Sequence, residues 1–493
     1  MTTTASSKSY EIRKKLNHPI IDADGHMREL SPIFLDYLRQ VGGSQVLERY
    51  NRASDRYTTT GAPDSWYKMS WEERRDSWTV RPAWWGGQTK NALDRATSMS
   101  PKLLHERMDE MGIDFAVLYP TQGLELPAIW DDELRQVACR AFNTYIAETY
   151  REYADRMTPV AVVPVHTPQE GIREMEHVVK ELRLKVAMVG APVLRPVAKV
   201  AREHPDLAGI ATRLDLLGLD ADHDYDPFWA KCVELGVAPT FHSSSMGWGS
   251  HRSISNYMYN HLGHFADSGV AMCKALFMGG VTRRFPTLRF AFLEGGVGWA
   301  CSLYNDMIGH WEKRNGKAIQ NIDPANLDRG RLLELLARYG DHQVTSRLAE
   351  LRAFVEREQQ RQPRQPEIDE WAACRIERVE EIKDLFEPHF YFGCEADDPV
   401  NAWAFNGKLN RFGARLRAML GSDIGHWDVT DMTLVLAEAY EMVEHGVMTK
   451  QDFRDFTFTN AVRLHAGMAP DFFKGTAIEG EANKLIASDA RRP

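Results

Sequence analysis

The sequence predicts an α/β fold of the (β/α)8 barrel class, and three observations support this. Eight short apolar runs are spaced along the chain, with helical patterns between most of them. The runs are apolar throughout, as expected of parallel strands that are buried on both faces. Four of the runs end at a residue that can bind a metal ion, and the active sites of such barrels lie at the C-terminal ends of the strands.

The expected elements follow in order along the chain. The expected strands cover residues 19–26, 115–120, 159–165, 186–189, 239–242, 290–294, 389–393 and 416–421. Helices are expected at about 101–111, 126–155, 168–182, 225–236, 430–446 and 450–465. The excursion at 27–100, after the first strand, is rich in Trp, Arg and Gly. A long irregular loop of this kind is usually a functional lid or disordered, and the aromatic content argues against disorder.

The domain organisation follows from these elements. We expect an N-terminal extension at 1–17, a barrel in two parts at 18–312 and 387–475, and a C-terminal tail at 476–493. Between the sixth and seventh strands, residues 313–386 contain charged helical stretches and are expected to form a helical insertion outside the barrel.

Composition limits the class of protein. The 493 residues carry a formal net charge of -9, which does not suggest a nucleic-acid-binding protein. The longest apolar stretches are too short to span a membrane, and the N-terminus lacks the apolar core of a signal peptide. Six scattered cysteines without CxxC spacing indicate reduced thiols. We therefore expect a cytoplasmic homo-oligomer that acts on a small molecule.

Potential metal ligands stand at the ends of four strands. Asp24 and His26 are two residues apart, so on an extended segment their side chains point the same way. His242 ends the fifth strand, Glu294 the sixth, and Asp423 follows the eighth. A single core histidine is usually structural, but buried carboxylates are rare unless they are paired or bind a metal. The combination predicts a site for one or two divalent cations.

The chain resembles the amidohydrolase superfamily, in its amidohydrolase-2 branch of metal-dependent hydrolases and decarboxylases. The segments that carry the resemblance are 21–29, 91–97, 292–299 and 421–428. It implies a (β/α)8 barrel with ligands from strands one, five, six and eight.

The resemblance also assigns the ligands residue by residue. The strand-one His-x-His of many members falls on Asp24 and His26, the strand-five His on His242, and the strand-eight Asp on Asp423. The strand-six position, often His, is Glu294. Two imidazoles and three carboxylates make iron or manganese as plausible as zinc. Strand four offers no ligand at its end, so a second ion would need a bridge through another carboxylate, such as Glu294, or through water.

Other residues are candidates for catalysis and substrate binding. Asp423 is the expected proton acceptor, and His426, three residues later, is a candidate acid or orienting group. Arg28 and Glu29 either clamp the metal loop or a substrate acid, or form a structural ion pair. The candidate substrate contacts are Trp84, Trp85, Ser244 and Trp299.

Several activities fit this site. The main hypothesis is a hydrolase in which a metal-activated water cleaves an ester, thioester or amide of a bulky apolar acyl group. The alternative, implied by the resemblance, is non-oxidative decarboxylation of an aromatic or unsaturated acid. Two further hypotheses are a non-haem iron oxygenase with a two-His, one-carboxylate site and a metal-bearing binding protein without catalysis.

Overall fold

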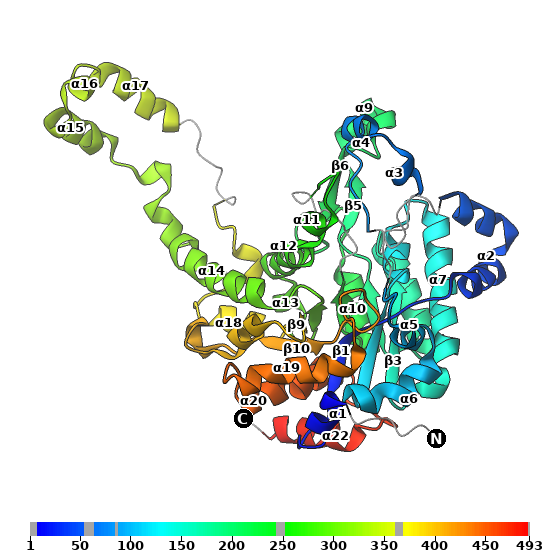
Figure 1. Ribbon diagram of the computed structural model, residues 1–493. Helices are drawn as coiled ribbons and strands as arrows, with labels where there is room; N and C mark the ends of the chain where they lie inside the picture. The colour runs from blue at the N-terminus through cyan, green and yellow to red at the C-terminus, as the bar shows by residue number, and fades with distance from the viewer. Residues whose placement is uncertain (1–6, 54–63, 84–86, 243–251, 360–367, 492–493) are drawn as a thin grey trace.

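A computed structural model describes residues 7–53, 64–83, 87–242, 252–359 and 368–491. Its centre is a sheet of eight parallel strands in the order β1-β2-β3-β4-β7-β8-β9-β10 (Figure 1). The strands are β1 Ile21–Met27, β2 Phe115–Pro120, β3 Met157–Val163, β4 Val186–Val189, β7 Pro239–Phe241, β8 Phe290–Phe292, β9 Phe390–Glu395 and β10 Arg417–Gly421. The fold is thus the predicted (β/α)8 barrel.

The barrel closes between its first and last strands. The backbone N–H of Asp423 donates to the carbonyl of Asp24 at 3.0 Å, and that of His26 donates to the carbonyl of Ile424 at 2.8 Å. The pairing of β1 with β2 shifts register between Asp22 and Gly25. Such bulges re-aim side chains next to active sites. The seam of the barrel therefore runs through two of the expected ligand segments.

The helices surround the sheet. The first part of the chain contributes α1 Lys8–Arg13, α5 Ala92–Met99, α6 Pro101–Met111, α7 Asp132–Tyr150, α8 Pro168–Glu176 and α10 Asp226–Leu235. The second part contributes α11 Tyr257–His261, α12 His264–Met278, α13 Val281–Arg284, α14 Gly298–Arg314, α18 Glu381–Phe386, α19 Val435–Glu444, α20 Lys450–Arg454, α21 Asn460–Ala466 and α22 Glu479–Asp489. Helix α6 shows how local sequence sets the bounds: Ser100 caps its start, Pro101 takes the first helical position, and Gly112 ends it with a φ of 73°.

The excursion after β1 is more regular than the sequence predicts. Its described part contains α2 Ser31–Ala53, α3 Asp64–Lys68, α4 Trp71–Asp76 and α5. Helix α2 breaks at Gly43 and packs on α7, where the rings of Phe34 and Phe142 meet edge to face at 5.9 Å. Burial of aromatic side chains against α7 stabilises a helix that its own sequence pattern does not reveal.

The segment after β4 also differs from expectation. Strands β5 Val193–Pro196 and β6 Thr212–Asp215 form an antiparallel hairpin outside the barrel, with α9 Ala198–Glu203 between them. The insertion between β8 and β9 is helical, as predicted. Its helices α15 Arg329–Tyr339, α16 His342–Thr345 and α17 Leu348–Gln359 lie at the end of an arm that extends away from the barrel (Figure 1). Among the described helices, none combines the length and the apolar character needed to cross a membrane.

Candidate metal centre

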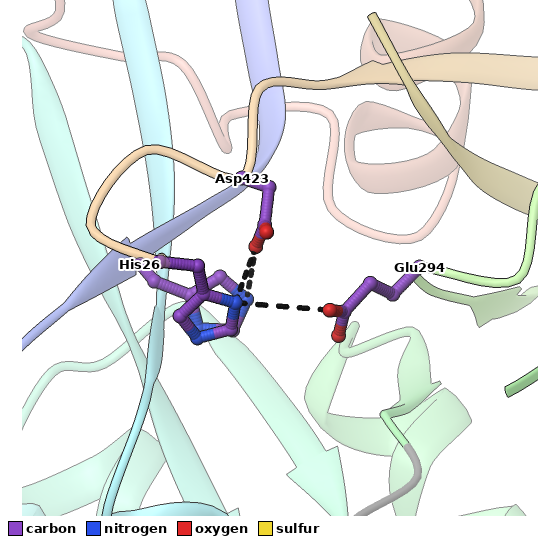
Figure 2. A group of neighbouring side chains, drawn as sticks. His26, Glu294 and Asp423 are labelled. Carbon is purple, nitrogen blue, oxygen red and sulfur yellow. Dashed lines mark ion pairs between the residues drawn. The ribbon is translucent and has the colours of Figure 1, made fainter. Parts of the chain in front are cut away.

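The five expected ligands converge at the C-terminal ends of the strands. Asp24 and His26 lie on β1. His242 directly follows β7, and Glu294 and Asp423 follow β8 and β10 after one intervening residue each. All five side chains are at most 6% exposed, so they form one buried polar cluster. Figure 2 shows Asp423 and Glu294 directed toward His26 from different sides.

His26 lies at the centre of this cluster. Its Nε2 is 3.4 Å from Asp423 Oδ1, 3.7 Å from Asp24 Oδ1 and 3.2 Å from His242 Nε2. His242 Nε2 is in turn 2.8 Å from Glu294 Oε2. The ligand atoms of Asp24, His26 and His242 all lie within 4.8 Å of one another, as do those of His26, Glu294, Asp423 and His426.

Hydrogen bonds orient His26 and connect the two ligand segments at the barrel seam. His26 Nδ1 lies 3.1 Å from the carbonyl of Pro120, which requires that this nitrogen carry the proton and donate. The lone pair of Nε2 then faces the cluster, the arrangement found in most metal-binding histidines. Asp22, which is fully buried, accepts from the N–H of Asp24 at 3.2 Å and also contacts Ser422. It therefore touches both ligand segments at the seam.

The backbone at two ligands is strained. Glu294 has a φ of 61° and Asp423 a φ of 50°, in the left-handed region that side chains larger than glycine rarely adopt. Gly425, with a φ of 97°, lies so close to the carbonyl of His26 that a Cβ there would collide with it. Such strain persists only where the surrounding structure enforces it, and it is concentrated at functional sites.

Burial sets the electrostatics of the cluster. It raises the pKa of Asp24 and of Asp423 well above the ordinary value, and the negative charge of Glu294 raises both further. Burial and the neighbouring imidazoles hold the pKa of His26 well below its usual range, which favours the neutral ligand form. Burial would raise the pKa of Glu294 as well, but His242 and His426 lower it well below normal.

The cluster has the properties of a cation site. Asp24 Oδ1, Glu294 Oε2 and both carboxylate oxygens of Asp423 are buried and lack a well-directed hydrogen bond. Buried polar atoms without partners are costly, and carboxylates are costlier still. Three carboxylates and two imidazoles would satisfy a divalent ion of the zinc, manganese or iron type. The residues present therefore fit the metal that the family resemblance implies.

His426 completes the site on its open side. Its ring stacks on that of His26 with centroids 3.7 Å apart, and its Nδ1 is 2.6 Å from Asp423 Oδ1. Its side chain is 14% exposed, whereas that of His26 is fully buried. Gln88 holds this loop by donating from Nε2 to the carbonyls of His426 and Val429 at 2.6 and 2.7 Å.

Of the four expected substrate-binding residues, the structure describes one. Trp84, Trp85 and Ser244 lie outside the described residues. Trp299 packs edge to face against Phe392 at 5.2 Å, in the wall beside β9, and its Nε1 is buried without a hydrogen bond. Its role in substrate binding stays a prediction.

Several site residues were not found from the sequence. The carboxylate of Glu294 raises the pKa of Tyr257, His261 and His264, although burial is the largest influence on each and lowers that of both histidines. These residues lie on or next to α11 and at the start of α12, so helices close one side of the site. Because none stands at a strand end, the pattern that revealed the ligands gave no indication of them.

Comparison with known proteins finds a matching family model and a similar curated protein. The family model described as amidohydrolase matches residues 94–345, just over half of the chain. The decarboxylase orsB of Emericella nidulans is 30% identical over 167 residues, which cover 31% of this chain and 42% of that protein. The chain thus matches less than half of the length of this curated relative.

The chain is also similar to solved structures. An amidohydrolase from Mycobacterium avium subsp. paratuberculosis K-10 is 17% identical with a TM-score of 0.51, and the match covers 91% of this chain and 98% of that one. A 5-carboxyvanillate decarboxylase from Novosphingobium aromaticivorans DSM 12444, complexed with manganese, is 14% identical with a TM-score of 0.49, covering 91% and 96%. The first likeness supports the barrel assignment.

Proposed function

This chain belongs to the amidohydrolase family, and on that premise we propose that it is a metal-dependent decarboxylase that releases CO2 from an aromatic carboxylic acid without oxidation. The sequence favoured a hydrolase and left decarboxylation as the alternative. The similarity to a decarboxylase over 167 residues is the observation that carries the choice of the alternative.

The metal would be held by Asp24, His26, His242, Glu294 and Asp423, whose ligand atoms lie around His26. When bound, a divalent cation would anchor the substrate carboxylate and stabilise negative charge as the carbon–carbon bond breaks. The strained backbone at Glu294 and Asp423 and the hydrogen bond from His26 to Pro120 hold the ligand side chains in place before substrate arrives.

Decarboxylation also needs a proton source. The reaction breaks the bond between the ring and the carboxyl carbon, and the ring carbon gains one proton for each CO2 released. Asp423 and His426 are in contact, and the His426 side chain, at 14% exposed, is more exposed than those of the five proposed ligands. In this proposal, the Asp423–His426 pair delivers the proton to the ring carbon, whose new C–H bond takes the electron pair left by CO2.

Burial suits this chemistry. Every proposed ligand side chain is at most 6% exposed, so few water molecules compete with the substrate for the cluster. Electrostatic interactions are also stronger where water is excluded. Decarboxylation, unlike hydrolysis, does not consume a water molecule, so a site that excludes water is compatible with it.

The test compares carboxylic acids with their esters. Purified protein, as isolated and after loading with manganese, zinc or iron, is incubated with hydroxybenzoic acids and with the methyl esters and thioesters of the same acids. We expect CO2 release from at least one acid, unchanged in the absence of oxygen, and no ester cleavage. Ester or thioester cleavage without CO2 release would replace this proposal with the hydrolase, and oxygen-dependent turnover would replace it with the oxygenase.

A further inference from the structure

A cavity lies at the end of the barrel opposite the candidate metal centre. Its volume is about 950 Å³, and it borders the N-terminal ends of β8, β9 and β10, whereas the candidate metal ligands stand at the C-terminal ends of the strands. Arg289 directly precedes β8, Tyr391 is the second residue of β9, and Arg417 is the first residue of β10. Residues of α20, α21 and α22 complete the wall, and α20 and α22 lie below β10 in Figure 1. The cavity is therefore separate from the metal centre.

Arginines and carboxylates make up much of the cavity wall. The wall contains four carboxylates and five arginines, which are Arg289, Arg415, Arg417, Arg454 and Arg463. Three of the arginines use all four carboxylates, in the ion pairs of Arg415 with Asp452 at 2.6 Å and with Asp455 at 3.2 Å, of Arg417 with Glu387 at 3.1 Å, and of Arg463 with Asp489 at 2.7 Å. Arg289 and Arg454 form no ion pair with any described residue. A cavity with such an excess of positive charge attracts anions.

The guanidinium of Arg289 is fixed in place but keeps unused donors. Its Nη1 donates to the carbonyl of Arg463 and, at 3.4 Å, to the hydroxyl of Tyr391. The end of α21 packs so closely on this arginine that a Cβ at Gly467 would collide with the guanidinium. Its Nε and Nη2 donate to no residue in the described part of the chain. Because Arg289 is half-buried, these unpaired N–H groups are unfavourable unless an acceptor enters the cavity.

Two further arginines of the wall also have donors without acceptors. Arg454, the last residue of α20, is half-buried, and its side chain makes no hydrogen bond or ion pair with the residues that the structure describes. The Nε of Arg417 is buried and lacks a hydrogen bond, although its Nη2 pairs with Glu387. Unpaired buried donors are rare in folded proteins and require an explanation. An anion with several oxygens would accept from all three arginines.

We infer that this cavity binds a small organic phosphate, whose phosphoryl oxygens accept hydrogen bonds from Arg289, Arg417 and Arg454. A phosphoryl group has three strong acceptor oxygens and nearly two negative charges at neutral pH, whereas a carboxylate has two oxygens and one charge. Arginine suits phosphate because its planar donors bind two oxygens at once. The volume exceeds what a phosphate ion fills, and Pro388 and Leu485 give the wall an apolar part for the organic portion.

Calorimetric titration of the metal-loaded protein at constant ionic strength tests this inference. The probes are adenosine monophosphate, glycerol phosphate and inorganic phosphate, with citrate as the carboxylate comparison. We expect at least one of the two phosphate esters to bind about ten-fold or more tightly than citrate, the scale of a charge-assisted hydrogen bond. Arg454→Met and Arg289→Met should each weaken that binding about ten-fold or more. Since Arg454→Met removes no hydrogen bond to a described residue, it should also keep the unfolding temperature of the ligand-free protein.

A matched variant and the contrary outcomes complete the test. Arg338→Met removes a positive charge from α15 on the arm, far from the cavity, and should leave every dissociation constant unchanged. Ester binding that is equally weak in Arg338→Met and Arg454→Met would overturn the inference, because net charge alone would then explain it. Ester binding that persists in both Arg289→Met and Arg454→Met would place the anion at the metal centre. Citrate binding as tight as that of both esters, or no ester binding at all, would also overturn the inference.

Discussion

The carboxylate of Asp22 accepts hydrogen bonds from both the backbone N–H and the hydroxyl of Ser422, at 2.9 and 2.5 Å, across 400 residues of chain. Ser422 directly precedes Asp423, and Asp22 also accepts from the N–H of Asp24. One buried carboxylate therefore links two candidate ligand segments. Gly25 is required beside it, because a Cβ at that position would collide with the Asp22 carboxylate.

Replacing Asp22 by Asn should weaken metal binding while the fold is retained. The amide keeps one acceptor oxygen but turns an N–H₂ donor toward groups that themselves donate. We expect metal affinity to fall about 10- to 100-fold, the usual effect of losing a group that orients a ligand. Chelator competition measures this, with the exposed Asp36→Asn on α2 as the control. Unchanged affinity in Asp22→Asn would show that Asp22 does not position the ligands.

The Asp423→Asn substitution should separate metal binding from turnover. Asn keeps the size and one oxygen that can coordinate, but it cannot exchange a proton with His426 or substrate. We expect a folded protein that retains at least part of its metal and loses about 10²-fold or more in turnover. Metal analysis and single-turnover kinetics measure the two effects. A metal-loaded variant with near-normal turnover would assign proton transfer to His426 alone.

Metal removal should destabilise the barrel. Four buried carboxylate oxygens would again lack partners, and a ligand that binds only the folded state stabilises it by about 2.7 kcal/mol at a hundred times its Kd. We expect dialysis against a chelator to lower the unfolding temperature and the addition of manganese or zinc to restore it. An unfolding temperature that changes neither with the chelator nor with added metal would contradict a metal centre in the barrel.

Acid should destabilise the protein through the buried His465, which is not one of the proposed metal ligands. Burial lowers the pKa of His465 from 6.5 to about 3, and its ring stacks on Phe472 at 4.5 Å. The unfolded chain therefore binds one more proton between these pH values, so stability is complete above pH 6.5 and falls as the pH drops below it.

His465→Leu should remove this contribution. Relative to the unmodified protein, the variant should lose about 2 kcal/mol less free energy of unfolding between pH 7 and pH 5. Urea unfolding at the two pH values measures the difference, with the exposed His204→Leu as the control. Equal pH dependence of the His465→Leu variant and the unmodified protein would contradict the shifted pKa.

Much of the barrel could be predicted because its determinants are local. The apolar runs at 115–120 and 186–189 match β2 and β4 residue for residue, and helix α6 is bounded by its own capping residues. The five candidate ligands were visible because each stands at the end of a buried run. A polar residue that interrupts an apolar run is a pattern in the sequence itself.

Other parts of the fold and of the site could not be predicted, because they depend on contacts between segments far apart in the chain. Helix α2 forms by packing on α7, and the hairpin of β5 and β6 lies outside the regular alternation. The sequence could not show that Glu29 forms no ion pair with the adjacent Arg28, because Glu29 accepts from backbone groups 92 to 94 residues away. Tyr257 and His261 come from a helix after a segment outside the described residues.

The most direct test of the account is the isotopic composition of the product formed in D₂O. Metal-loaded protein is incubated with the acid that gives the largest CO2 release, and the product is examined by NMR and mass spectrometry. The account predicts one deuterium at the ring carbon that carried the carboxyl group, and much less of this product from the Asp423→Asn variant in the same time. A product that keeps its carboxyl group and contains no ring deuterium would contradict decarboxylation at this centre.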